Sequence, residues 1–295
     1  MEKTFLIGLG AQKAGTTWVH SYLKAHPECA TGKVKELSVL TGYFSNRQGM
    51  APRVKMKINA LREELDLYER RTRNNNDNAE ANKQLLYAID YLAADHDLEY
   101  YLSYARRLLA DNPGAKLVSD ITPAYSTLKP ENILETRTLL EAEGCRPKAL
   151  FLMRDPVERC YSALRMGARN KAWATKTDIG TSKDNFFANA TADWCQVRTR
   201  YENIVPAIEA AFGAENCLFA FYETFISEPG VRSLCDFLDI SYVAPKLDHK
   251  VNASPRTEEP DPAEWAQVRE TYKDTYQFCA DRFGADAVAQ VWPEK

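Results

Sequence analysis

Short apolar runs alternate with amphipathic segments along most of the chain. Residues 5–10, 116–121, 148–153 and 217–221 are apolar runs of strand length, and residues 29–35 form a further extended piece. Apolar residues at helical spacing predict helices over residues 17–25, 131–143, 194–212, 230–238 and 262–283, and another after Pro156. Strands that alternate with helices across short connections predict a parallel sheet with helices on both faces.

Residues 45–112 interrupt this alternation. Helical spacing over 58–71 is followed by the asparagine-rich break at 74–78, and further apolar stripes follow in 85–92 and 101–108. We therefore expect an α/β, three-layer fold that forms a single domain over residues 1–295, with a helical insertion at about 45–112.

The overall composition excludes several classes of protein. Hydrophobic residues make up 45% of the chain and charged residues 27%, a balance typical of globular proteins rather than disordered chains or coiled coils. The 38 Lys and Arg against 41 Asp and Glu give a formal net charge of −3. Without an overall positive field, we expect neither a nucleic-acid partner nor a membrane partner. An anion site would have to be local.

The cysteines and the first residues bear on the compartment. Seven cysteines lie scattered without a C-x-x-C pair, which favours a reducing compartment over a disulfide framework or a zinc site. The apolar run at 5–10 is too short for a signal peptide or a membrane span. We expect a cytoplasmic protein.

The turn after the first apolar run predicts an anion site. It contains Gly10, Ala11, Gln12, Lys13, Ala14, Gly15, Thr16, Thr17 and Trp18. Small residues let backbone N–H groups surround an anion, and the start of the following helix adds a favourable dipole. The turn matches neither a Rossmann fingerprint nor a Walker A loop, because Lys13 stands where the first needs glycine and Thr16 stands where the second needs lysine. An ordinary strand-to-helix turn with an incidental lysine remains open.

Three later segments at expected strand ends also carry polar chemistry. Lys35 and Glu36 follow the second extended piece, where the pair is either a general base with a cation or a solvated surface pair. Residues 119–125 read as a polar turn. Arg154 ends a buried strand, Asp155 and Pro156 suit a helix start, and Ser162 lies two turns further on. Arginine and a hydroxyl at one strand end can bind a phosphate, or the arginine can be purely structural.

In this order, the four segments closely resemble the family of sulfotransferases that use 3′-phosphoadenosine 5′-phosphosulfate (PAPS). The resemblance covers most of the chain, and it is specific because two motifs occur in the right order about 140 residues apart. It implies a P-loop-like fold in which the insertion at about 45–112 lies on the substrate side. It also implies that PAPS is the donor co-substrate, that no metal takes part, and that Lys13 stabilises the leaving phosphate. The donor-binding residues that it implies are Gln12, Lys13, Ala14, Gly15, Thr16, Thr17, Trp18, Arg154, Ser162, Tyr222, Asn252, Ser254 and Arg256.

Within that family, Lys35-Glu36 resembles the glycosaminoglycan-modifying and related bacterial branch. This resemblance implies that Glu36 is the general base, since no histidine lies between residues 97 and 154 to serve instead. The branch often has a lysine where this chain has Ile121, so a second cation is either missing or supplied by Lys35.

The acceptor implied is a hydroxyl or an amine on a sugar or small molecule, held between the strand ends and the insertion. Tyrosines and a phenylalanine of residues 43–104 offer an aromatic wall there, although such residues at helical spacing are also ordinary core. Two other functions stay open: a nucleotide-dependent small-molecule kinase, and a nucleotide-binding relative without catalysis.

Overall fold

The computed structural model describes residues 3–44, 50–73, 78–94, 97–169, 186–247 and 260–293. Within these residues, five parallel strands form one sheet in the order β2-β3-β1-β4-β5. The strands are β1 (Lys3–Gly10), β2 (Cys29–Thr31), β3 (Leu117–Ile121), β4 (Cys145–Met153) and β5 (Cys217–Phe221). The four apolar runs predicted as strands are all confirmed.

The central strands are buried on both faces, as a parallel sheet between two helical layers requires. Residues 4–10 of β1 and residues 147–153 of β4 are buried without interruption. In the register of the sheet, Gly8 of β1 lies opposite Ile121 on one side and Leu150 on the other. The carboxyl ends of β3, β1 and β4 therefore reach the same edge of the sheet, where ligands of such folds bind.

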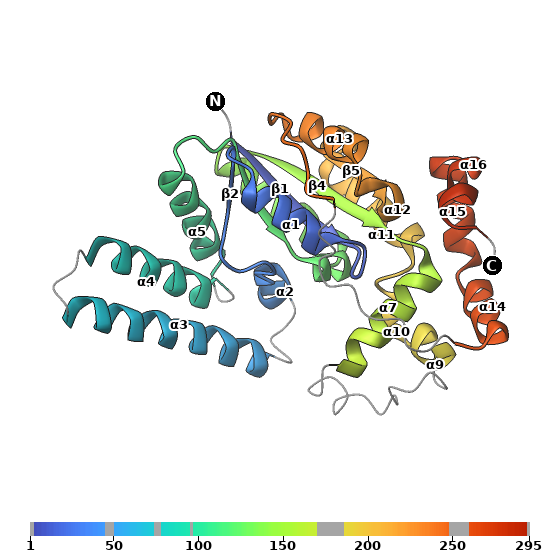
Figure 1. Cartoon of the computed structure of the whole chain (residues 1–295), viewed down its shortest axis with the longest axis horizontal. Helices are drawn as coiled ribbons and strands as arrows, with labels where there is room; N and C mark the ends of the chain where they lie inside the picture. The colour runs from blue at the N-terminus through green and yellow to red at the C-terminus, as the bar shows by residue number, and fades with distance from the viewer. Residues whose placement is uncertain are drawn as a thin grey trace.

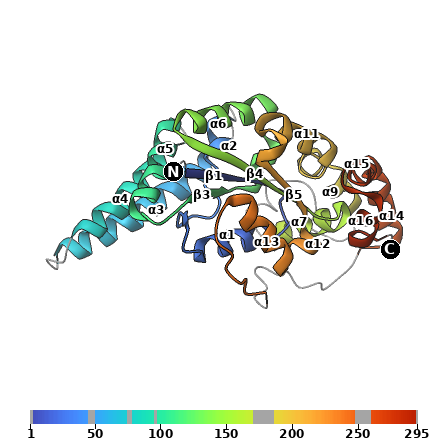
Figure 2. The ribbon, with the colours of Figure 1, turned by 90° about the horizontal axis from the view of Figure 1, so that it is seen from above.

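Helices cover both faces of the sheet, which confirms the predicted α/β architecture. Figure 2 shows α6 (Pro130–Ala142) and α11 (Tyr201–Phe212) on one face. On the other face lie α1 (Thr16–Ala25), α7 (Pro156–Arg169), α12 (Tyr222–Phe225) and α13 (Glu228–Leu238).

The helices predicted for the insertion are present in the described part of residues 45–112. They are α3 (Met50–Arg73), α4 (Asn78–Ala93) and α5 (Leu98–Asp111). In Figures 1 and 2, α3 and α4 lie side by side and project away from the sheet as a helical arm. Lys57 of α3 is buried at the base of this arm, where its Nζ donates to the carbonyl oxygen of Tyr91 at 2.6 Å.

The extended piece predicted at 29–35 is shorter than expected. Strand β2 ends at Thr31, opposite Ser119, and the chain then bends towards α2 (Val39–Phe44), which the pattern did not predict. A Cβ atom at Gly32 would lie 2.0 Å from the hydroxyl of Tyr104 in α5. Helix α5 thus passes close to the backbone at Gly32, the position at which the pairing of β2 with β3 stops.

Two predicted helices are each divided into two, and side-chain hydrogen bonds to the backbone occur at both breaks. Over 194–212, α10 (Asp193–Gln196) is separated from α11 by turns, and Thr199 Oγ1 donates there to the carbonyl of Cys195 at 2.6 Å. Over 262–283, α14 (Pro262–Thr271) and α15 (Lys273–Phe283) meet at the buried Tyr272, whose hydroxyl donates to Ala190. Such contacts leave no mark on helical periodicity.

The C-terminal helices cover strand β5 at one end of the sheet. Phe221 of β5 packs edge-on against Phe283 at the end of α15 and against Trp292, which follows α16 (Ala285–Val291). The short helix α9 (Phe186–Thr191) packs between α7 and α14 in a second apolar cluster. Strand β5, which is an edge of the sheet, is thus protected from pairing with another chain.

The described residues also include two short 3₁₀ helices, η1 (Pro123–Thr127) and η3 (Ala214–Asn216).

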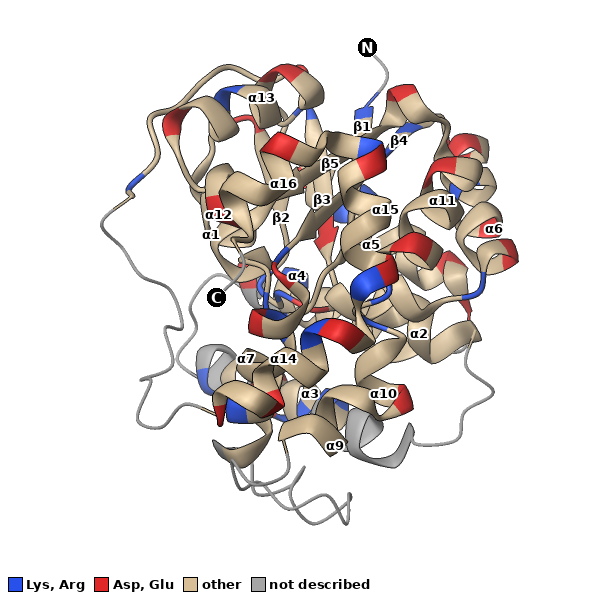
Figure 3. Cartoon of the chain, turned by 90° about the vertical axis from the view of Figure 1, so that its right-hand side faces the viewer, with Lys and Arg blue, Asp and Glu red and all other residues tan. Residues whose placement is uncertain are grey.

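Acidic and basic residues are interspersed over the helices on the side seen in Figure 3, in keeping with the small net charge. Among the helices of the described residues, none has the length and apolar character needed to cross a membrane.

Candidate active site

The turn that follows β1 approaches two aromatic rings. Gly10 ends the strand against Phe151 of β4, where an added Cβ atom would lie 2.8 Å from the ring. Gly15 adopts a left-handed conformation with φ of 78° and has the ring of Tyr222 in the place of a side chain, 2.7 Å from an added Cβ. Because Gly15 is also the N-cap of α1, no side chain caps the first turn of this helix.

The polar residues of this turn have different exposures. Gln12, Lys13 and Thr17 are half-buried, whereas Ala14 and Thr16 are buried. The Oε1 atom of Gln12 is buried and has no hydrogen-bond partner among the described residues, so it is an acceptor placed beside the turn without a donor. Trp18 is 7% exposed and stacks on Tyr22, so its indole ring belongs to the packing of α1.

Arg154 joins the turn to the end of β4. Its Nη1 atom donates to the carbonyl oxygen of Lys13 at 3.0 Å, and its Nη2 atom lies 3.3 Å from Glu158 Oε2. The guanidinium also lies 5.2 Å from the ring centre of Tyr222. The two motifs that the sequence places 141 positions apart therefore touch directly, with Tyr222 packed against both.

The start of α7 is fixed as its sequence predicts. Asp155 Oδ1 accepts a hydrogen bond from the N–H of Glu158 at 2.9 Å, which is the side-chain cap expected before Pro156. Tyr276 donates to the other carboxylate oxygen of Asp155 at 2.9 Å. Burial raises the pKa of Asp155 against the lowering effect of these hydrogen bonds and of Arg269. Two turns further along the same helix, Ser162 is 5% exposed.

Lys35 and Glu36 lie on the segment that connects β2 with α2. They form an ion pair with each other, and the side chain of Glu36 is 49% exposed while that of Lys35 is 22% exposed. His20 of α1 is buried, and burial together with the charges of Lys24 and Lys35 lowers its pKa to about 4.

A buried carboxylate holds this segment in place. Asp120, at the end of β3, accepts hydrogen bonds from Tyr125 at 2.6 Å, Thr122 at 2.7 Å and Tyr101 at 3.0 Å. Thr122 and Tyr125 in turn accept hydrogen bonds from the backbone N–H groups of Ser38, at 3.2 Å, and Leu40, at 3.4 Å. The residues just after Glu36 are thereby tied to the end of β3.

The chemistry of Asp120 follows from its burial. Burial raises the pKa of the carboxyl, the three hydroxyl donors lower it, and the charge of Glu36 raises it. Next to Asp120, Ile121 is wholly buried against Gly8, so its side chain is part of the sheet core and supplies no cation.

Sequence reasoning missed several residues that position the site. It treated residues 119–125 as a polar turn and gave Asp120 no part in positioning the site, and it gave no role to Glu158 or Tyr201. Glu158 lies four residues after Arg154 on a helix, a spacing that predicts an ion pair. Tyr201 donates to the carbonyl oxygen of Arg154 at 2.8 Å, and a contact at this sequence separation has no local signal.

The late segment that resembles a loop over the donor lies outside the described residues. It carries Asn252, Ser254 and Arg256, which the resemblance implies in donor binding. Among the residues that the structure describes, no group of three or more His, Cys, Asp or Glu side chains is arranged to hold a metal ion.

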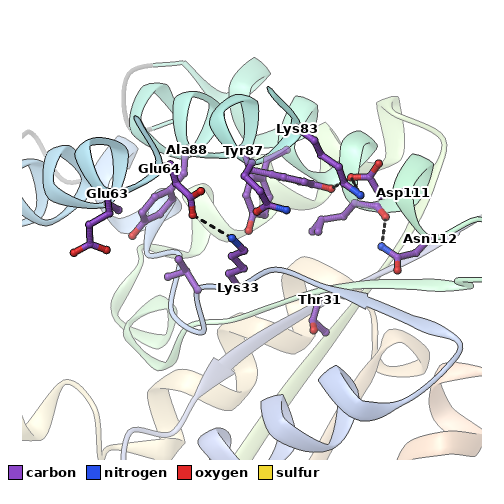
Figure 4. Close-up of a pocket in the computed structure, with 15 residues that line it drawn as sticks. Thr31, Lys33, Glu63, Glu64, Lys83, Tyr87, Ala88, Asp111 and Asn112 are labelled. Carbon is purple, nitrogen blue, oxygen red and sulfur yellow. Dashed lines mark hydrogen bonds and ion pairs between the residues drawn. The ribbon is translucent and has the colours of Figure 1, made fainter. Parts of the chain in front are cut away.

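A cavity of about 260 Å³ lies between the insertion and the end of β2 (Figure 4). Tyr87, Tyr91 and Tyr104 line it from α4 and α5, and Lys33 and Val34 line it from the segment after β2. Lys33 forms an ion pair with Glu64 of α3 at 3.1 Å, drawn as a dashed line in Figure 4. The predicted aromatic wall is therefore only partly in this cavity, because Tyr101 is buried against Asp120.

A parallel sheet with a glycine-containing turn, a helix start and an arginine at one edge defines an α/β protein in which a helix N-terminus and cationic side chains meet at that edge. Residues 6–244 match the profile of the sulfotransferase family, and the chain belongs to this family.

Solved structures show the same fold. The crystal structure of a sulfotransferase from Alicyclobacillus acidocaldarius is similar at a TM-score of 0.58 and 18% identity, over 95% of each chain. The sulfotransferase domain from the curacin biosynthetic pathway is similar at a TM-score of 0.50 and 17% identity, over 84% of this chain and 77% of that one. No curated protein sequence matches the chain.

Proposed function

We propose that this sulfotransferase transfers a sulfuryl group from PAPS to a hydroxyl or amine of a sugar or small molecule. The observation that carries the proposal is the 3.0 Å hydrogen bond from Arg154 to the carbonyl of Lys13. It brings a turn suited to one phosphate and an arginine suited to another within the span of a single nucleotide. A donor with phosphate groups at both the 5′ and 3′ positions matches this pair of cationic groups.

The turn after β1 is proposed to hold the 5′-phosphosulfate. The uncapped start of α1 presents N–H groups and a positive dipole end, and Thr16 and Thr17 lie in its first turn. Lys13 would stabilise the charge that develops on the leaving phosphate. The unpartnered Oε1 atom of Gln12 is an acceptor for a ligand N–H or O–H group.

Arg154 and Ser162 are proposed to hold the 3′-phosphate. A guanidinium has five N–H donors, so the two contacts of Arg154 with Lys13 and Glu158 leave donors for a phosphate. Tyr222, which packs on Gly15 and beside Arg154, is the aromatic ring nearest to both groups in these contacts. The position of Tyr222 supports the expectation that its ring borders the nucleoside. Trp18 is buried and stacked on Tyr22, so any contact of Trp18 with the nucleoside would come from the core side.

Glu36 is proposed as the general base, with Lys35 as the accompanying cation. When bound, PAPS supplies an activated sulfuryl group. Glu36 then takes the proton of the acceptor hydroxyl or amine, while Lys13 stabilises the negative charge on the leaving phosphate. The half-exposed Glu36 can be reached by an acceptor, and the ties of Ser38 and Leu40 to the end of β3 fix its backbone.

The cavity beside Lys33 is proposed to hold the part of the acceptor that does not react. Three tyrosines along one side suit a sugar ring or a planar phenol, and its lining ends at Lys33 and Val34, directly before Lys35-Glu36. The cavity and its tyrosines do not require a glycosaminoglycan, the acceptor of the branch that Lys35-Glu36 resembles.

A transfer assay separates this function from the two others. The protein is incubated with radiolabelled PAPS, and in parallel with radiolabelled ATP and Mg²⁺, over a panel of sugars, phenols and amines. We expect label to move only from PAPS. Transfer from ATP alone would establish the kinase, and binding of adenosine 3′,5′-bisphosphate without transfer to any acceptor would establish the relative without catalysis.

A further inference from the structure

A buried arginine lies on α7 between the two residues proposed to hold the 3′-phosphate. Arg159 is wholly buried, and no described Asp or Glu forms an ion pair with it. Its Nε and Nη1 atoms have no hydrogen-bond partner among the described residues. A guanidinium is always charged, so a buried one needs a negative group beside it.

Two cysteines surround the remaining nitrogen of this guanidinium. Nη2 lies 2.6 Å from Sγ of Cys195, in α10, and 3.5 Å from Sγ of Cys160, in α7. The two sulfur atoms lie 3.3 Å apart, and both side chains are almost wholly buried. Thr199 adds a hydroxyl 3.7 Å from the sulfur of Cys160.

This arrangement supplies the missing negative charge as a thiolate. Burial by itself would raise the pKa of Cys160, but the thiol of Cys195 and the guanidinium of Arg159 lower it to about 6. Burial and the neighbouring Cys160 raise the pKa of Cys195. The contacts of Arg159 with both sulfurs thus favour one thiolate in the pair, with the guanidinium as its counter-ion.

Two other buried cysteines, Cys29 and Cys279, have no such cation among the described residues. Burial raises the pKa of Cys29 and the pKa of Cys279 to about 12. Thiols in that state are poor nucleophiles, because reactivity requires the thiolate. Oxidative chemistry should consequently select the Cys160–Cys195 pair.

We propose that Cys160 and Cys195 are a reversible oxidation site, at which a hydroperoxide converts the two thiols into an intramolecular disulfide. The sulfurs need to approach by about 1.3 Å to reach the bond length of a disulfide. The disulfide would link α10 to α7, the helix that carries Ser162 and begins just after Arg154, so it alters the surroundings of the proposed 3′-phosphate site.

The reaction balances in two steps. The Cys160 thiolate attacks one oxygen of the peroxide, the O–O bond breaks, and the departing hydroxide takes a proton to leave as water, which gives a sulfenic acid. The sulfur of Cys195 then attacks the sulfur of the sulfenic acid, and its proton leaves with the hydroxyl group as a second water. Two thiols are oxidised and one peroxide is reduced. The disulfide is neutral and leaves Arg159 without its counter-ion, so a dithiol reductant should reverse it readily.

Peptide mapping of the full chain tests this proposal without reference to sulfuryl transfer. The reduced protein is treated with hydrogen peroxide, its remaining thiols are alkylated, and the digest is examined by mass spectrometry. We expect one linked peptide that joins Cys160 to Cys195, and its disappearance after dithiothreitol. A Cys279→Ser variant is the matched control and should form the same linked peptide.

A second variant tests the order of the steps. In Cys195→Ser, we expect peroxide to stop at a sulfenic acid on Cys160 that dimedone labels, with no linked peptide. Either of two results in the wild-type protein would overturn the proposal. The first is a set of linked peptides between other cysteines. The second is a pair at 160 and 195 that stays reduced while Cys29 or Cys279 is oxidised.

Discussion

Arg154 is the residue at which several parts of the proposed site meet. It donates to the backbone of Lys13, pairs with Glu158 and lies beside Tyr222. Tyr201 fixes its backbone through a hydrogen bond to the carbonyl oxygen. The motif around Arg154 could be recognised from the sequence because the strand end, the cap and the serine are all local signals. Its contacts with Lys13 and Tyr201 could not, since they depend on how distant segments pack.

The side chain of Glu36 carries the catalytic prediction. Glu36→Gln removes the proton acceptor but keeps the size and polarity of the side chain, so we expect turnover to fall by about 10²–10⁴-fold. Binding of adenosine 3′,5′-bisphosphate should be unchanged, because the donor is held elsewhere. Steady-state transfer kinetics and calorimetry measure the two effects.

The control for this prediction is Glu131→Gln, which changes a carboxylate that is 68% exposed on α6. It should leave both measurements at the wild-type level. A near-wild-type turnover in Glu36→Gln would assign the base to another residue.

Among the elements, the connection between β3 and η1 positions the Glu36 segment. Asp120 collects three hydroxyl donors, and two of these hydroxyls accept from the backbone after Glu36. A buried, hydrogen-bonded carboxylate of this kind rigidifies the backbone around it. The position of the proposed base therefore depends on the connection between β3 and η1.

Tyr125→Phe tests this anchoring. It removes one donor to Asp120 and the acceptor for the N–H of Leu40, so we expect the free energy of unfolding to fall by about 1–3 kcal/mol. The hydrogen bond of Tyr125 lowers the pKa of Asp120, and its loss raises that pKa further above the unfolded value. Protonation of Asp120 therefore offsets part of the stability that the variant has lost at low pH. This offset disappears as pH rises through the raised pKa of Asp120.

The destabilisation by Tyr125→Phe should accordingly be larger at about pH 8 than at about pH 5, a pH just above the ordinary pKa of an Asp side chain. Urea unfolding at both pH values measures it. Tyr100→Phe on the exposed side of α5 is the control and should change stability by less than about 0.5 kcal/mol. Equal losses for the two variants would mean that the hydrogen bonds of Tyr125 contribute nothing.

The elements differ in how far the sequence determines them. The apolar runs of β1, β3 and β4 predicted strands correctly because each lies buried between two helical layers, and the run of β5 did so although its residues are only half-buried. The short strand β2, the helix α2 and the break at Tyr272 escaped prediction. Each depends on a tertiary contact, such as that of Tyr104 with Gly32 or of Tyr272 with Ala190, that leaves no periodic pattern.

At the scale of the whole molecule, the order of the strands creates the proposed site. Strand β1 lies between β3 and β4, so the segments that follow these three strands converge at one edge of the sheet. The spacing of 141 positions between Lys13 and Arg154 becomes a direct contact. The helical arm of the insertion then adds a tyrosine-lined cavity beside the Glu36 segment.

Calorimetric titration of two nucleotides into the protein and its variants tests most directly whether one donor bridges both motifs. We expect Lys13→Ala to weaken binding of both adenosine 3′,5′-bisphosphate and adenosine 5′-monophosphate, by about 10- to 150-fold. Arg154→Ala should weaken the bisphosphate by a similar factor and leave the monophosphate, which has no 3′-phosphate, nearly unchanged. Lys129→Ala, at a lysine that is 77% exposed, should alter neither. Bisphosphate affinities in Lys13→Ala and Arg154→Ala equal to that of the wild type would contradict the account.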